Sequence, residues 1–123
     1  MLRPVKILVV EPHAEVRALI GHVVERLGYE PVYPTGRRGE VLPECDVDVL
    51  LVEPADPGAL SAAKTLRDDH EELPIVCASI YPRFEQADRL GPVAYLVKPF
   101  GLAELEQALS TAVESVAAPA PAS

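Results

Sequence analysis

The chain alternates short apolar runs with longer segments in which apolar residues recur every three or four positions. Short runs rich in valine, leucine and isoleucine are typical of strands that are covered on both faces of a parallel sheet. A spacing of three and four residues is typical of amphipathic helices. The alternation of the two patterns therefore predicts an α/β protein in which helices cover both faces of a parallel sheet.

Five segments carry the strand pattern. The central one contains the consecutive apolar residues Val49–Val52 and ends at an acid followed by proline. The second strand contains Pro31, which lacks a hydrogen-bond donor and so places that strand at a sheet edge. An edge position for the second strand fits a flavodoxin-like (βα)5 three-layer sandwich with strand order 2-1-3-4-5. The predicted strands are Val5–Val10, Tyr29–Tyr33, Val47–Glu53, Pro74–Ser79 and Val93–Val97.

The helical pattern is clearest between the first two strands, where Pro12 suits the first turn and Gly28 suits the C-terminal stop. The segment after the second strand contains two glycines and ends at a proline, so it has room for a short helix at most. The fourth predicted helix is also short and ends before Gly91. The predicted helical segments are His13–Leu27, Thr35–Pro43, Ala59–Asp69, Arg83–Leu90 and Leu102–Val116.

Length and composition narrow the class of protein. A chain of 123 residues suits one domain, predicted over residues 1–117, and the Ala/Pro-rich residues 118–123 predict a disordered tail or the start of a linker. The net charge of -8 leaves no basic stripe for phosphates, which argues against direct nucleic-acid binding. With no signal peptide or membrane span in the pattern, we expect a cytoplasmic protein. Cys45 and Cys77 lack metal-type spacing, and we expect reduced, mostly buried thiols.

Four polar residues stand at the carboxyl ends of predicted strands. Glu11 follows the first strand, Glu53 ends the third, Ser79 ends the fourth and Lys98 follows the fifth. The carboxyl ends of parallel strands lie on one edge of the sheet, which is where open α/β sheets place their ligands. We therefore expect two acids, a hydroxyl and a lysine to lie together.

The same residues carry a resemblance to a known family. Residues 5–109 resemble a response-regulator receiver domain of the CheY-like superfamily. VKILVVEP resembles the first strand with its acidic pair, VDVLLVEP the strand of the phosphorylated aspartate, and PIVCAS the strand of the signalling hydroxyl. YLVKPF (Tyr95–Phe100) resembles the closing Tyr-x-x-Lys-Pro-Phe motif and is the most specific of the four. The resemblance implies signal transduction in a two-component phosphorelay, with a histidine kinase or a downstream effector as partner.

The chain departs from the family at the phosphoryl site. Glu53 stands where the family has the acceptor aspartate, and its carboxylate reaches about 1.5 Å further. Pro12 stands where the second acid of the pair is expected, so Glu11 remains alone and one oxygen ligand for Mg²⁺ is missing. Phosphoryl transfer depends on such a metal. We therefore predict a pseudo-receiver that is not phosphorylated at Glu53, binds Mg²⁺ weakly or not at all and has no other cofactor.

The resemblance also implies roles for residues that the chain keeps. Ser79 and Tyr95 match the hydroxyl and the aromatic residue that move together when the family's domains are activated. Lys98 matches the lysine of the site, and Pro99 is expected to follow a cis peptide bond, which is accessible only before proline. The Ser79–Lys98 segment looks a few residues short for the family. We therefore expect a reshaped partner surface and do not assume the family's usual dimer.

Several readings of the site stay open at this level. Lys98 is expected to pair with Glu53 or Glu11, either as a structural remnant or to hold the pocket as phosphate would. A working receiver would use Glu53 or Asp56 as the acceptor. A small-ligand or metal sensor would reuse the pocket, with His13, Glu11 and Glu53 as candidate metal ligands. We expect no enzyme activity, since the sequence shows neither a nucleophile–base pair nor a Gly-rich phosphate loop.

Overall fold

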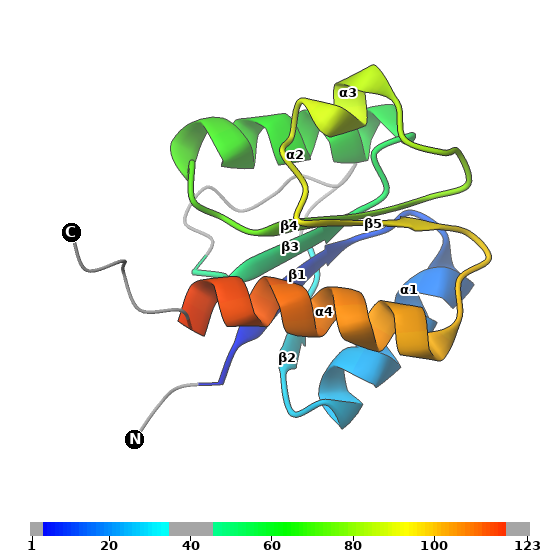
Figure 1. Cartoon of the computed structure of the whole chain (residues 1–123), viewed down its shortest axis with the longest axis vertical. Helices are drawn as coiled ribbons and strands as arrows, with labels where there is room; N and C mark the ends of the chain where they lie inside the picture. Colours follow the sequence, from blue (N-terminus) through cyan, green and yellow to red (C-terminus); the bar gives the residue numbers. More distant parts are fainter. Residues whose placement is uncertain (1–3, 35–45, 118–123) are drawn as a thin grey trace.

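A five-stranded parallel sheet forms the middle layer of the protein (Figure 1). The computed structural model describes residues 4–34 and 46–117. The strand order β2-β1-β3-β4-β5 confirms the predicted flavodoxin-like fold. The strands are β1 (Lys6–Val10), β2 (Glu30–Val32), β3 (Val49–Val52), β4 (Ile75–Ser79) and β5 (Ala94–Val97). The helices are α1 (Ala14–Arg26), α2 (Pro57–Asp69), α3 (Glu85–Asp88) and α4 (Leu102–Ala117).

Helices cover both faces of the sheet, and successive residues of each strand point to opposite faces. Ile7 and Val9 of β1 pack toward α1 and α4, whereas Leu8 and Val10 pack toward α2 and α3. The central β3 is buried at all four positions, as its uninterrupted apolar pattern predicted. Both cores meet at β3, so the residues that follow it are held by a strand that is buried on both faces.

The edge strands follow the chemistry of their sequences. β2 pairs only with β1 among the described strands, with Pro31 opposite Ile7. A proline at a sheet edge leaves no ladder hydrogen bond unmade. The prediction that Pro31 marks an edge strand is therefore confirmed.

Two helix starts differ from the predictions. α1 begins at Ala14, with His13 in the N-cap position, so Pro12 lies before the helix and not in its first turn. α2 begins at Pro57, two residues earlier than predicted, because the Asp56 carboxylate accepts a hydrogen bond from the Ala59 N–H at 2.9 Å. An acid at the N-cap followed by proline is a strong helix start, whereas the prediction took Pro57-Gly58 for a turn.

The helix between β4 and β5 is shorter than predicted. α3 spans Glu85–Asp88 in place of Arg83–Leu90, and Gly91 reverses the chain after it with a φ of 66°. The part of the chain that the structure describes holds four helices, not five, because the segment Thr35–Pro43 lies outside it. Cys45 and residues 118–123 also lie outside the described residues.

Cys77, in the middle of β4, is a free and fully buried thiol. Desolvation by its apolar surroundings raises the pKa of the Cys77 thiol from 9.0 to about 12. It therefore stays protonated at neutral pH and acts as a small apolar side chain. No helix in the described ranges is both long enough and apolar enough to cross a membrane.

Arg67, near the end of α2, connects the turn after that helix with the end of the α3 segment. Its Nε donates to the Leu90 carbonyl at 2.8 Å, and its Nη1 donates to the carbonyls of Glu71 at 2.6 Å and His70 at 3.4 Å. Burial lowers the pKa of the guanidinium, which nevertheless stays charged. One side chain thus fixes the end of α2 to the end of the short α3 segment.

We expect Arg67→Met to lower the free energy of unfolding by about 1–3 kcal/mol, because it leaves the partly buried Leu90 carbonyl without its donor and also removes two exposed hydrogen bonds. Chemical denaturation measures the loss. The matched control is Arg89→Met, which removes an exposed i,i+4 pair with Glu85 and should cost less than about 0.5 kcal/mol. Equal losses in the two variants would contradict a bridging role for Arg67.

Candidate functional site

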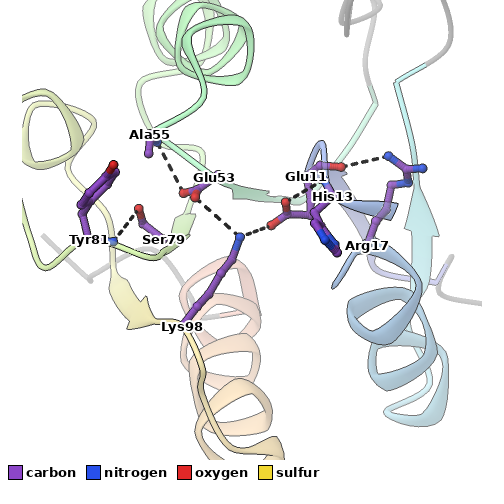
Figure 2. A network of polar contacts seen from close by, with 8 residues as sticks. All are labelled: Glu11, His13, Arg17, Glu53, Ala55, Ser79, Tyr81 and Lys98. Atoms are coloured by element: carbon purple, nitrogen blue, oxygen red, sulfur yellow. Dashed lines mark hydrogen bonds and ion pairs between the residues drawn. The ribbon is translucent and has the colours of Figure 1, made fainter. Parts of the chain in front are cut away.

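Four polar residues lie together at the carboxyl edge of the sheet (Figure 2). Glu11 follows β1, Glu53 follows β3, Ser79 ends β4 and Lys98 follows β5. Glu11, Glu53 and Ser79 are the buried polar residues of the described chain, at 3%, 6% and 0% exposure. The strand order places these residues on adjacent strands, so four separate stretches of sequence supply one site.

The Lys98 ammonium lies between the two carboxylates. Lys98 Nζ donates to Glu11 Oε1 at 2.6 Å and lies 3.6 Å from Glu53 Oε1. The side chains of Lys98, Glu11 and Glu53, which we call the Lys98 cluster, are 14%, 1% and 8% exposed. A buried charge needs such a partner, and here one cation is shared by two anions.

The two acids of the Lys98 cluster are held with different strength. Glu11 Oε2 accepts the His13 N–H at 3.0 Å, so both of its oxygens have close donors. Glu53 Oε2 has only a long contact to the Ala55 N–H at 3.4 Å. Lys98 therefore pairs chiefly with Glu11, and Glu53 is the looser member.

The site offers few oxygens to a divalent cation. Pro12 has no side-chain oxygen, and both oxygens of Glu11 already accept hydrogen bonds. Mg²⁺ requires oxygen ligands in near-octahedral geometry. Within the described ranges, no group of three or more His, Cys, Asp and Glu side chains is placed to hold a metal ion. His13 joins the site through its backbone N–H while its side chain is exposed, so the structure gives no support to the His13 metal site.

Asp56, the other candidate acceptor, lies at the start of α2. One of its oxygens accepts the Ala59 N–H, and its own backbone N–H donates to the Glu53 carbonyl at 3.3 Å. These contacts assign Asp56 a local structural task, which is to begin the helix after the Glu53 loop.

Ser79 and Tyr95 both contact the loop that follows β4. Ser79 Oγ accepts the Tyr81 N–H at 3.2 Å. The Tyr95 hydroxyl lies 2.8 Å from the Tyr81 carbonyl and 3.1 Å from that of Pro82. Burial raises the pKa of the Tyr95 phenol, which therefore stays a neutral donor. The Arg83 guanidinium lies over the Tyr95 ring, 5.6 Å from its centroid, in a cation–π contact.

The chain after Lys98 returns to the core. The Lys98–Pro99 peptide bond is cis, as the resemblance implied. Phe100 packs against the core beneath α4. Lys98 therefore lies between the exposed last residue of β5, Val97, and Phe100, which is anchored in the core on the same face as α1.

Comparisons with known proteins show the fold. No protein family model matches this chain, and no curated protein does. Solved structures match over nearly its whole length. The fold is that of response-regulator receiver domains.

Three of these structures show the extent of the likeness. CheY4 of Vibrio cholerae shares 22% identity at a TM-score of 0.74, over 88% of this chain and 98% of that one. A response regulator from Thermotoga maritima shares 17% identity at a TM-score of 0.72, over 90% of this chain and 99% of that one. NtrX from Brucella abortus, in complex with ADP, shares 21% identity at a TM-score of 0.78, over 94% of this chain and 27% of the NtrX chain. This chain thus spans about a quarter of the NtrX chain.

Sequence reasoning placed the four edge residues but missed their neighbours. Arg17 Nη1 donates to the Glu11 carbonyl at 3.0 Å and so holds the backbone of the site from α1. No pattern predicts a bond from a side chain to a backbone carbonyl six residues away. The capping role of Asp56, in contrast, could have been predicted, because an aspartate directly before a proline is a typical helix start.

The unequal contacts of the two acids predict unequal costs of neutralising them. Glu11→Gln should lower the free energy of unfolding by about 3 kcal/mol, because it leaves Lys98 buried with only a distant partner. Glu53→Gln should cost less than about 1 kcal/mol, because its contacts are long. Denaturant unfolding at neutral pH measures both. A larger loss in Glu53→Gln would contradict the assignment of Glu11 as the principal partner.

Proposed function

We propose that this chain is a pseudo-receiver, a non-enzymatic signalling module that acts through protein contacts and independently of phosphorylation at residue 53. The observation that carries the proposal is the position of the Lys98 ammonium between the carboxylates of Glu11 and Glu53. The receiver fold supports a role in signal transduction. The chemistry of the site supports a module without a phosphoryl cycle.

The oxygen inventory of the site supports this reading. Phosphoryl transfer to a carboxylate requires a cation that neutralises the incoming phosphoryl group. Glu53 and Glu11 are the acids beside Lys98, and Glu11 has no oxygen without a close donor. A cation would have to displace Lys98 from a 2.6 Å bond in a buried site. Pro12 has no side-chain oxygen that could bind the cation and offset the loss of the Lys98 bond.

A phosphate-accepting receiver is the competing function. It requires Glu53 to accept despite its longer side chain, or Asp56 to replace it. The Asp56 carboxylate caps α2 through Ala59, so phosphorylation there would compete with a helix start. This contact favours the pseudo-receiver.

An apolar surface beside the site supports protein contact as the mode of action. Ile80, Tyr81 and Val97 are 60%, 55% and 46% exposed. Ile80 and Tyr81 follow Ser79 in the chain, and Val97 precedes Lys98. The short α3 leaves this surface to the loop after β4, which Tyr95 holds in place. Large exposed apolar side chains that gather in one region are typical of protein interfaces. We propose a protein partner, either a histidine kinase or a downstream effector, for this surface.

The phosphoryl site is tested by NMR titration of backbone amides with Mg²⁺ and then with beryllofluoride, which stands in for a phosphoryl group. We expect no shift of the amides of Glu11, Glu53, Ser79 and Lys98 at millimolar Mg²⁺ or after beryllofluoride. Shifts of these amides together with Tyr95 would show a competent acceptor and refute the proposal.

A repaired variant serves as the matched control. Pro12→Asp combined with Glu53→Asp restores an acidic pair and an acceptor of the usual length. We expect this variant to bind Mg²⁺ and beryllofluoride, with shifts at Ser79 and Lys98. A silent wild type beside a responsive variant would assign the loss to these two positions.

The contact surface is tested by affinity capture with wild type and two surface variants. Val97→Glu places a charge on the proposed interface and should abolish capture of any specific partner. Leu19→Glu changes an apolar residue of α1 that is 44% exposed and should leave capture unchanged. Equal capture by both variants would show that partners bind elsewhere.

A further inference from the structure

A groove of about 690 Å³ lies beside the Lys98 cluster, on the side of β2. The ends of β1 and β2 and the start of α2 form its walls. This is the point where the sheet order reverses between β1 and β3, which is the usual ligand crevice of open α/β sheets. Its volume is within the range of small-molecule sites. Lining residues that bear on its chemistry are Glu11, Pro12, Arg17, Tyr33, Pro34 and Asp56.

Arg17 supplies the available charge of this groove. Its one side-chain hydrogen bond in the described structure goes from Nη1 to the Glu11 carbonyl, and in the same ranges it forms no ion pair. A guanidinium has five N–H donors, so most of its donors remain for a ligand. The bond to Glu11 also fixes the direction in which the guanidinium points.

The two acids that line the groove have other partners. The Glu11 carboxylate accepts from Lys98 and from the His13 N–H, and Asp56 accepts from the Ala59 N–H. Neither acid forms an ion pair with Arg17 in the described part of the protein. Arg17 is therefore the cation among the described lining residues, and its guanidinium forms no ion pair with the two acids beside it in that part of the protein.

Tyr33 supplies an aromatic surface. The residue is 39% exposed and lines the groove with Pro34. Its hydroxyl lies against Gly21 of α1, where a Cβ would collide with it. Glycine at position 21 thus lets the tyrosine ring rest on the helix. The ring and Pro12 give the groove apolar walls that suit a flat molecule.

We propose that this groove binds a small organic anion with a flat aromatic body, whose carboxylate or phosphate is bound by Arg17 and whose ring packs on Tyr33. Arg17 would tie the ligand to the Glu11 backbone and thereby to the Lys98 cluster. The inference does not depend on the proposed function, because it involves neither phosphorylation of Glu53 nor the apolar surface at Val97.

The test is an amide NMR titration of the full chain with phenyl phosphate and, separately, with benzoate. We expect saturable shifts at Glu11, Arg17, Tyr33 and Ala59, with dissociation constants of about 1 mM or below. Inorganic phosphate tests the anion alone, and benzyl alcohol tests the ring alone. At equal concentration, we expect each of these two compounds to cause shifts of these amides that are about tenfold smaller than those caused by phenyl phosphate. The comparison of phenyl phosphate with benzoate identifies the preferred anion.

Variants make the assignment specific. Arg17→Gln should weaken phenyl phosphate binding about tenfold or more, Arg17→Lys should restore part of it, and Tyr33→Leu should weaken it severalfold. Arg89→Gln, an exposed arginine on the other face of the sheet, should bind as the wild type does. Absence of saturation, shifts that map elsewhere, or unchanged affinity in Arg17→Gln would overturn the proposal. Equal binding of inorganic phosphate would refute the aromatic ligand.

Discussion

One lysine shared by two buried carboxylates is the constraint on which this site depends. Lys98 enters from the end of β5, Glu11 from β1 and Glu53 from β3, so the sheet must be correctly paired before the three charges can meet. Removal of Lys98 or Glu11 leaves a buried charge without its close partner, and such an ion costs several kcal/mol, whereas the looser Glu53 is the least costly of the three to neutralise. The cluster therefore couples the chemistry of the site to the integrity of the sheet. A cation or phosphoryl group has to compete with this arrangement before it can bind.

The two departures from the receiver pattern act together. A longer acid alone would still have a neighbouring carboxylate to share a cation, and a missing carboxylate alone would still leave an acceptor of the usual length. With Glu53 and Pro12 both present, the site keeps its lysine and its hydroxyl, and both oxygens of its remaining first-strand acid, Glu11, already accept hydrogen bonds. Ser79 and Tyr95 both contact the loop after β4. These observations are why we favour a module that signals through its surface.

Much of this arrangement could be predicted because it depends on regular patterns. The apolar runs predicted the sheet, and Pro31 predicted which strand forms its edge. The parallel arrangement of the strands predicted that Glu11, Glu53, Ser79 and Lys98 lie at one end of the sheet. What escaped prediction depends on local geometry. The preference of Lys98 for Glu11 over Glu53 depends on where the His13 and Ala55 N–H groups point. The weak helical pattern of Arg83–Leu90 could not reveal that α3 is only Glu85–Asp88 long. The contacts of Arg17 and Arg67 go to backbone carbonyls, which carry no sequence signal.

Arg67 has a further consequence for the dynamics of the protein. Its guanidinium joins the turn after α2 to the turn before β5, and β4 runs between these two connections. Local opening of one connection must break hydrogen bonds that also hold the other, so α2 and α3 belong to one cooperative unit of native-state fluctuation. Such a unit exchanges its amide hydrogens together. Ser79 ends β4, and Tyr95 holds the loop that follows it, so we expect motion of this loop to be coupled to the end of α2.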